Sequence, residues 1–389
     1  MTNPQNHPWC KPFTPLDLKS VLDLTIDCDD ANKVCTFLCL LSAYTRDSQF
    51  NISFNAPSST GKSYIPTQIA ELFPPEDVRA IAYCSPKAFF HEVGKVDKKK
   101  RCVVDLSKKI LIFLDQPHNE LLARLRPMLS HDSREISLKI TDRSKSSGLR
   151  TKDVLLKGYP SVIFCTAGLQ IDEQEATRFL LLSPEMHQGK LQKSVESAMI
   201  AESDKDAHNA RINSNLSRTL LKRRIEAIKK ANIDDIRVED HDKVMNIFFN
   251  SGKPLLPRHQ RDVKRVIALV KAFALLNLWW RRKDGNAIYA NQDDVSWAVE
   301  LWKHVCGGQD LNLPPYVYGI YKDIIAPLCQ HGGVSRRAIF DAHYRMYGRH
   351  ADPRQFSYHI LPMLESSGLI DVMSDPKDKR RQLVTLRGK

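Results

Sequence analysis

The segment APSSTGKS at residues 56–63 constrains the fold of this chain more than any other feature. It matches the phosphate-binding pattern G-x-x-x-x-G-K-[ST], except that Ala56 replaces the first glycine. A short alternating strand, FNISFN at 50–55, precedes the segment and a helical run follows it. A chance GKS in a surface loop would lack these flanking elements. The segment therefore predicts a turn whose backbone N–H groups wrap the phosphates of a nucleotide.

The residues of this turn have distinct expected roles. Gly61 permits the backbone to approach the phosphates closely, while Ala56 mainly affects the shape of the turn. Lys62 is expected to reach the β- and γ-phosphates, and Ser63 to bind Mg²⁺, so ATP and Mg²⁺ are the predicted cofactors. The residues expected to surround the phosphates are Ala56, Pro57, Ser58, Ser59, Thr60, Gly61, Lys62 and Ser63.

A second part of the site is predicted at the end of the apolar run KILIFLDQ, residues 109–116. Asp115 is expected to hold Mg²⁺. The next position normally carries the carboxylate that polarises the attacking water, but here it is Gln116, whose amide orients water without accepting its proton. Three explanations stay open: Glu120 or Asp132 acts instead, turnover is slow, or Gln116 is itself a replacement.

Strand and helix patterns alternate along the first half of the chain, which predicts an α/β domain with a parallel sheet. Further strands are expected at 78–83, 161–166 and 179–182, and the continuous apolar run at 109–115 is typical of a strand buried on both faces. Helices are expected at 29–44, 86–93 and 119–129, whereas residues 1–28 are expected to form an irregular arm.

Two polar turns between strand patterns predict hairpins. The first is the basic turn KVDKKKR at 95–101, and the second lies between the strands expected at 135–141 and 154–157. From residue 187 the chain is polar and helical to about 250, and amphipathic helices are expected at 258–282 and 292–305. The role of 187–250 stays open between a linker and a brace between subunits.

The last part of the chain predicts a winged helix, which is a variant of the helix-turn-helix motif. Helices are expected at 335–348 and 352–370, the second with Pro362 inside it, and strands at 370–373 and 382–386. Exposed basic residues here are expected to contact DNA, although many winged helices bind only protein. These residues are Arg354 on the second helix and Lys377, Lys379, Arg380 and Arg381 on the wing.

The charge of the chain favours an anionic partner. There are 58 Lys and Arg against 45 Asp and Glu, which gives a net charge of +13, although solubility alone would also explain an excess. No signal peptide is visible, and charges interrupt the most apolar stretch, 263–280, so no membrane partner is expected. Nine scattered cysteines, with Cys35 and Cys39 expected in the core, fit reduced thiols in the cytoplasm and no zinc site.

The order of these motifs resembles the AAA+ ATPase core of MCM-type replicative helicases, especially their compact forms from mobile elements and phage-like replicons. The resemblance covers about residues 29–389. It implies that Thr166 is the sensor 1 residue and that Arg178, in the ATRF segment, is an arginine finger supplied to a neighbouring subunit. It further implies that Arg261, or its near rival Arg258, is the sensor 2 arginine. A finger of this kind implies a homo-oligomeric ring, expected to be a hexamer.

The resemblance divides the chain into an arm (1–28), an α/β ATPase core with two hairpin insertions (29–186), a helical linker and lid (187–306), a linker (307–315) and a winged helix (316–389). It also implies that the two hairpin tips line a central channel and follow the phosphate backbone of single-stranded DNA. The basic tip residues are Lys98, Lys99, Lys100, Arg101, Arg143, Lys145 and Arg150. An N-terminal DNA-binding collar is not expected within this chain, so either the ring forms through the ATPase domains alone or a replication partner supplies the collar.

The leading hypothesis is therefore an ATP-dependent DNA helicase or translocase. A first alternative is a replication initiator or helicase loader that binds duplex DNA without unwinding it. A second alternative, motivated by Gln116, is a nucleotide-binding scaffold or DNA-binding protein that does not hydrolyse ATP.

Overall fold

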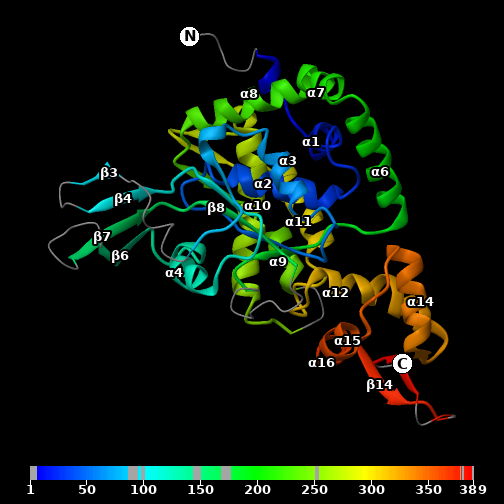
Figure 1. Ribbon diagram of the computed structural model, residues 1–389. Helices are drawn as coiled ribbons and strands as arrows, with labels where there is room; N and C mark the ends of the chain where they lie inside the picture. The colour runs from blue at the N-terminus through cyan, green and yellow to red at the C-terminus, as the bar shows by residue number, and fades with distance from the viewer. Residues whose placement is uncertain are drawn as a thin grey trace.

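The structure is a computed structural model (Figure 1). It describes residues 7–85, 95–97, 101–142, 150–167, 177–249, 254–376, 378 and 381–387. The helix expected at 86–93 and most of both hairpin tips lie outside the described residues. In the part of the chain that is described, no helix has both the length and the apolar character needed to cross a bilayer.

A five-stranded sheet in the order β2-β5-β8-β1-β9 forms the centre of the molecule, and every pairing in it is parallel. This confirms the predicted α/β architecture. The strand β8 lies between β1 and β5. β1 leads into residues 56–63, the predicted phosphate-binding turn, which we call the phosphate loop, and β5 leads to Asp115. The strands are β1 (Ile52–Asn55), β2 (Val78–Ile81), β5 (Ile110–Phe113), β8 (Ser161–Thr166) and β9 (Leu180–Leu182).

Side chains of this sheet alternate between two apolar layers, so both faces are buried. Ile110 and Ile112 of β5 pack into one layer, and Leu111 and Phe113 pack into the other. The first layer is covered by the helices α2 (Asp30–Ser42), α3 (Tyr64–Ala70), α10 (His259–Leu276) and α11 (Gln292–Val305). The second layer is covered by α4 (Asn119–Leu129), which matches the predicted helix.

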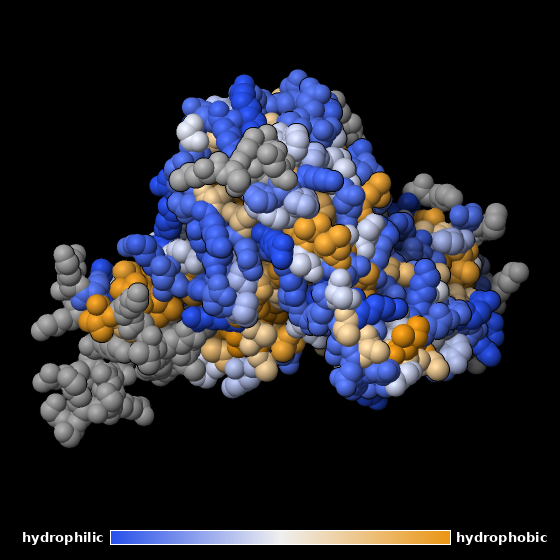
Figure 2. Space-filling model, turned by 90° about the horizontal axis from the view of Figure 1, so that it is seen from above, coloured by the Kyte–Doolittle hydropathy of each residue, from blue (hydrophilic) through white to orange (hydrophobic). Residues whose placement is uncertain are grey.

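The two predicted hairpins are confirmed, and they are joined into one four-stranded sheet that projects from the body (Figures 1 and 2). We call this sheet the arm. Parallel pairing of β4 with β7 joins the first hairpin to the second. The strands of the arm are β3 (Lys95–Val96), β4 (Cys102–Asp105), β6 (Glu135–Asp142) and β7 (Arg150–Lys157).

Both hairpin turns lie at the same end of the arm. Each turn immediately precedes the start of β4 or of β7, and these two strands run in the same direction. Cys102, the first residue of β4, pairs with Val154, whereas β7 begins four residues earlier at Arg150. At about 3.3 Å per residue, β7 therefore begins about 13 Å farther toward the turns than β4 does.

The base of the arm requires glycine at one position. Gly158 follows β7 with a φ of +85°, and a Cβ there would lie 2.6 Å from the backbone nitrogen of Ser107. The chain therefore enters and leaves the arm through two segments in direct contact, which fixes the arm against the central sheet.

Between residue 187 and α10 the described residues form further helices, and this region also contributes to a small sheet that was not predicted. The helices are α6 (Gln188–Ser203), α7 (Lys205–Ser214), α8 (Leu216–Ala231) and α9 (Asp242–Phe249). The small sheet has the order β10 (Asp235–Arg237), β12 (Ala287–Tyr289), β11 (Lys283–Asp284). Its strands have two or three residues each, which is too short for an alternating pattern to stand out in the sequence.

The N-terminal segment 1–28, which was predicted to be irregular, contains the short helix η2 (Pro8–Cys10) and the helix α1 (Pro15–Leu22). The hydroxyl of Thr14 accepts a hydrogen bond from the Asp17 backbone, and the Asp17 carboxylate accepts one from the Thr14 backbone. This capping box begins α1, and Leu18 and Leu22 are buried in the core.

One arginine of the basic cluster at 220–230 has a structural role. The buried Arg224 guanidinium donates hydrogen bonds to the backbone carbonyls of Trp9, Lys11 and Leu276. Burial lowers the pKa of Arg224 to about 10. The side chain thereby attaches the N-terminal segment to α8 and α10.

The C-terminal region has its own apolar core and a three-stranded antiparallel sheet in the order β13-β15-β14. The helices predicted at 335–348 and 352–370 are confirmed, and a π turn relaxes the second helix just before Pro362. The helical elements are α12 (Pro315–Ile320), η6 (Tyr321–Ile325), α13 (Ala326–Leu328), η7 (Cys329–His331), α14 (Arg336–Tyr347), α15 (Pro353–Gln355), η8 (Phe356–Ile360) and α16 (Leu361–Ser366). The strands are β13 (Val334–Ser335), β14 (Ile370–Ser374) and β15 (Gln382–Leu386).

Candidate nucleotide site

The phosphate loop follows β1 and leaves open space above its backbone. Ser59 and Gly61 both have positive φ angles, 63° and 88°. A Cβ at Gly61 would meet no protein atom within 4 Å, so glycine is required here for its φ and the space beside it is free. The Thr60 hydroxyl donates to the Pro57 carbonyl over 2.9 Å, which closes the turn. The backbone therefore forms a concave turn that can accept phosphate groups.

The loop is attached to the neighbouring strand β8 at two points. The Ala56 backbone N–H donates to the Thr166 carbonyl over 3.2 Å, and the Cys165 thiol donates to the Lys62 carbonyl over 3.4 Å. Burial raises the pKa of Cys165 to about 12, while the nearby Lys62 acts to lower it and Asp115 acts to raise it. The thiol therefore stays protonated, and the predicted phosphate ligand Lys62 and metal ligand Asp115 are both close enough to influence its pKa.

Asp115, Gln116 and Thr166 converge beside this loop at the carboxyl edge of the sheet. The Gln116 backbone donates to Asp115 Oδ1 over 2.8 Å, and the Thr166 hydroxyl donates to Gln116 Oε1 over 3.0 Å. Asn55, which sequence reasoning did not single out, pairs in register with Thr166 and is buried. Its position as the last residue before APSSTGKS was the available signal.

The two residues considered as substitutes for the missing carboxylate lie at opposite ends of α4. Glu120 is in the first turn of that helix and forms an ion pair with Arg124. Asp132 follows the other end, where the Leu129 carbonyl accepts a hydrogen bond from Asn51 at the start of β1. Asp132 therefore lies toward the amino edge of the sheet, away from the phosphate loop of its own chain.

Arg178 also lies at the amino edge, away from the phosphate loop of its own chain. It precedes β9 by two residues, and Leu180 of β9 pairs with Ile52, the first residue of β1. Ile52 and Ala56 are four residues apart along β1, which corresponds to about 13 Å, and Arg178 comes before Leu180 on the side away from Ala56. The Arg178 Nε donates to the Ser130 hydroxyl over 2.9 Å at the end of α4.

Arg261 and Arg258 have different environments, although they are one turn apart at the start of α10. Arg261 is exposed, and its guanidinium donates to the Thr177 hydroxyl, next to Arg178. Arg258 is only 6 % exposed and is bound to Asp262 and to the backbone carbonyl of Gln309. Arg258 is therefore a structural residue, while Arg261 and Arg178 lie together at the amino edge.

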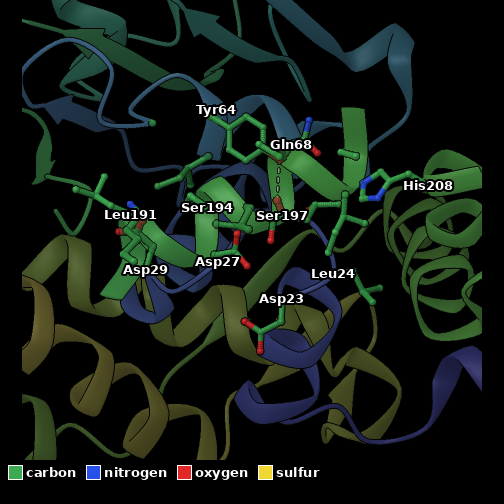
Figure 3. Close-up of a pocket in the computed structure, with 18 of the residues that line it drawn as sticks. Asp23, Leu24, Asp27, Asp29, Tyr64, Gln68, Leu191, Ser194, Ser197 and His208 are labelled. Carbon is green, nitrogen blue, oxygen red and sulfur yellow. Dashed lines mark hydrogen bonds and ion pairs between the residues drawn. The ribbon is translucent and has the colours of Figure 1, made fainter. Parts of the chain in front are cut away.

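The phosphate loop opens on a cavity of about 1230 Å³ (Figure 3). Tyr64 and Gln68 of α3 line one side, and Ser194 and Ser197 of α6 line another. The segment 23–29, the helix α7, and Tyr347 and Arg349 of the C-terminal region also line the cavity. The Tyr64 hydroxyl donates to the Thr25 carbonyl over 2.9 Å, which connects the phosphate-loop helix to that segment. The cavity is large enough for the nucleoside of a nucleotide whose phosphates occupy the loop.

Within the described residues, one group brings three potential metal ligands together: Cys28, Glu185 and His187, with ligand atoms within 4.8 Å of one another. His187 Nδ1 accepts a hydrogen bond from the Lys190 backbone and caps α6. A neutral ring then carries its proton on Nε2, which lies 3.1 Å from a Glu185 oxygen. The arrangement is a hydrogen-bonded helix cap.

The residues predicted to contact nucleic acid are described only in part. Arg101 lies on the turn side of the first hairpin, directly before β4, and pairs with Asp97 over 2.8 Å. The backbone of Arg150 begins β7 at the end of the arm, and Arg354 and Arg381 are exposed in the C-terminal region. Lys98, Lys99, Lys100, Arg143, Lys145, Lys377, Lys379 and Arg380 lie outside the described residues.

Comparison with known proteins yields only a distant structural similarity. No family model matches the chain, and no curated protein matches its sequence. Among solved structures, the chain is similar to a full-length MCM homolog from Methanopyrus kandleri, with a TM-score of 0.44 and 14% sequence identity. The alignment covers 78% of this chain and 62% of that protein, so the chain spans about three fifths of its length.

Proposed function

We propose that this chain is an ATPase of the MCM-like AAA+ type whose ATP sites form between adjacent copies, and that it uses ATP to move along DNA. One observation carries the proposal: Lys62, Ser63 and Asp115 belong to one edge of the central sheet, whereas Arg178 and Arg261 lie at the other. We further propose that it serves a mobile element or phage-like replicon in the cytoplasm.

A second copy completes this site. If the amino edge of one copy faces the phosphate loop of the next, Arg178 approaches the γ-phosphate that Lys62 binds. Its guanidinium then stabilises the charge that develops on the γ-phosphate during transfer to water, while Ser63 and Asp115 hold the Mg²⁺ that compensates the remaining charge. Contacts of this head-to-tail kind close into a ring when the rotation permits, and we propose a hexamer.

The arm is the proposed DNA-contacting element of the motor. It presents two turns at the same end, and their sequences contain Lys98–Arg101 and the RSKSSGLR segment at 143–150. Lysine and arginine at such tips bind phosphates without reading bases, as a translocating motor requires. In the ring, the tips of all copies would point into the channel and hold a single strand.

The C-terminal region is a proposed winged helix that contacts duplex DNA. The helices α14 and α15–α16 pack beside the hairpin β14–β15, as this motif requires. Arg354 and Tyr358 are exposed on the second helix, and Arg381 is exposed beside the turn of the hairpin. These side chains suit contacts with the phosphate backbone.

Measuring ATPase activity with and without DNA, together with particle mass with and without nucleotide, tests the proposal. We expect DNA to stimulate turnover, nucleotide to favour a ring, and Lys62→Ala to abolish ATP binding and the unwinding of a forked duplex. Sequence-specific duplex binding without unwinding would favour the initiator or loader. No turnover above background with DNA present would favour the non-hydrolysing scaffold, the reading that Gln116 motivates.

Substitutions at the hairpin turns test the role of the arm. We expect the triple change of Lys98, Lys99 and Lys100 to alanine, and separately Lys145→Ala with Arg150→Ala, to remove most DNA stimulation while retaining basal turnover. Changing the exposed Lys303 of α11 to alanine is the matched control. Unwinding that survives both sets of changes would show that the arm does not line the channel.

A further inference from the structure

We propose that Gln116 donates a hydrogen bond to the terminal phosphate of bound ATP, and that Thr166 orients its amide for this task. The pair would then distinguish ATP from ADP at a position where a water-activating carboxylate is absent. This inference rests on the nucleotide site proposed above.

The strand order directs the Gln116 side chain toward the phosphate loop. Gln116 follows β5 by three residues, and Thr166 is the last residue of β8, which separates β5 from β1. Because the Thr166 hydroxyl lies 3.0 Å from Gln116 Oε1, the side chain reaches from β5 to the end of β8. That direction is toward β1 and the loop that begins at Ala56.

The hydrogen bond also determines which end of the amide remains available. A glutamine amide has one acceptor oxygen and one NH₂ group with two donors. The Thr166 hydroxyl donates to the oxygen, so the NH₂ group is the end left for a ligand beside the loop. Phosphate oxygens accept hydrogen bonds, and a neutral NH₂ group donates to them without adding negative charge to the site.

The geometry of this pair is held by backbone contacts on both sides. Thr166 is only 6 % exposed, and its carbonyl accepts the hydrogen bond from Ala56 that attaches the phosphate loop. The Gln116 backbone donates to the carboxylate of Asp115, the proposed Mg²⁺ ligand. The amide is therefore placed between the loop and the metal ligand, where the γ-phosphate of ATP would lie.

Loss of this donor should affect ATP and leave ADP unaffected, because ADP has no γ-phosphate. A hydrogen bond to a charged acceptor corresponds to about a tenfold change in affinity. Thr166→Val removes the orienting hydroxyl but keeps the shape of the side chain, so the amide can turn its oxygen toward the phosphate. Thr166→Ser keeps the hydroxyl. Thr166 is thus a positioning residue.

The experiment measures the affinity of the full-length chain for ADP and for a non-hydrolysable ATP analogue, both with Mg²⁺. We expect Gln116→Ala and Thr166→Val to weaken analogue binding about tenfold while ADP binding changes less than about twofold. Thr166→Ser should match the unmodified chain. The controls are Gln192→Ala on the exposed side of α6 and Thr385→Val in β15, and both should leave both affinities unchanged.

Equal losses for the two nucleotides, no loss for either, or a Thr166→Ser variant that behaves like Thr166→Val would overturn the inference. Thermal unfolding of each variant identifies any that fail to fold. If Thr166→Val is one of them, the nucleotide affinities of Thr166→Ser and Gln116→Ala still test the inference. If the unmodified chain binds neither nucleotide and Lys62→Ala changes nothing, the proposed site itself fails. If the chain binds both nucleotides and Gln116→Ala leaves their ratio unchanged, only the role of Gln116 fails.

Discussion

The two edges of the central sheet differ in composition and in how firmly they are held. The carboxyl edge carries a loop of small residues with open space beside Gly61 and an exposed Asp115. At the amino edge, Arg178 and Arg261 are hydrogen-bonded to Ser130 and Thr177, and Arg265 binds the Thr177 carbonyl over 2.6 Å. The carboxyl edge thus has a shape that can accept phosphates, whereas the arginine side chains at the amino edge are held in place by hydrogen bonds.

Under the proposed function, each edge would contain half of a catalytic site. Phosphate transfer needs both a cradle for the phosphates and a cation for the charge that develops in the transition state. The two halves lie at opposite edges of the sheet in one chain but would meet wherever copies stack edge to edge. The firm support of the arginines suits a group that must arrive at a neighbour in one fixed orientation.

Removing the finger should have the largest effect on turnover. We expect Arg178→Ala to lower kcat about a thousandfold, because the charge of the transition state loses its partner, while ATP affinity changes little. Steady-state ATPase assays and nucleotide titration check this. The exposed Arg223 of α8, changed to alanine, is the control. A loss of less than about threefold would mean that the amino edge takes no part in catalysis.

Restoring a proton acceptor at the carboxyl edge should have the next largest effect. We expect Gln116→Glu to raise kcat about a hundredfold, since a carboxylate accepts the proton that the attacking water releases. The same assay measures the gain, which Lys62→Ala in the same chain should abolish. An unchanged or lower rate in Gln116→Glu would show that the missing carboxylate does not limit turnover.

The support of the amino edge can be tested by stability. Asp262 is fully buried and pairs with both Arg258 and Arg265. Asp262→Ala leaves two buried guanidinium groups without their carboxylate, so we expect the free energy of unfolding to fall by about 3–5 kcal/mol in urea titrations. Changing the exposed Glu300, which pairs with Lys303, to alanine should lower the free energy of unfolding by less than about 0.5 kcal/mol. Similar losses for both variants would contradict this difference.

Acid should weaken the amino edge through His131, which follows the Arg178 partner Ser130. Burial lowers the pKa of His131 to about 4, below its ordinary value of 6.5. Stability that is present above pH 6.5 is therefore lost as the pH falls toward 4, because the unfolded chain binds the proton more readily. Between pH 7 and pH 5 the loss is about 2 kcal/mol.

The matched variant for this test is His131→Asn. It removes the titrating ring, and asparagine tolerates the positive φ of 57° at this position. We expect denaturation at the two pH values to show a loss about 2 kcal/mol smaller in the variant than in the unmodified chain. An equal loss in both proteins would mean that His131 does not cause the acid sensitivity.

Features of the fold that depend only on residues close together in the sequence were predicted well. The strands at 109–115 and 161–166, the helix at 119–129 and both hairpins follow from local apolar runs and polar turns, and the structure contains them. The predicted site residues Lys62 and Asp115 also belong to one edge, because carboxyl ends of parallel strands share an edge.

Features that depend on distant contacts could not be predicted in the same way. Arg258 and Arg261 are one helical turn apart. Their sequence spacing does not show that Arg258 is the buried one, bound to Gln309 and Asp262. The partnership of Arg224 with the Trp9 carbonyl joins residues 215 positions apart. The helix α1 was missed although Thr14 and Asp17 form a recognisable capping pair.

The claim that two chains share each site is tested most directly by mixing two inactive variants. Lys62→Ala keeps an intact Arg178, and Arg178→Ala keeps an intact phosphate loop. In an equal mixture, roughly a quarter of the contacts between copies join the two intact halves. We expect the mixture to recover ATPase activity well above the sum of the separate variants. A mixture no more active than that sum, under conditions where the copies exchange and assemble, would contradict a shared site.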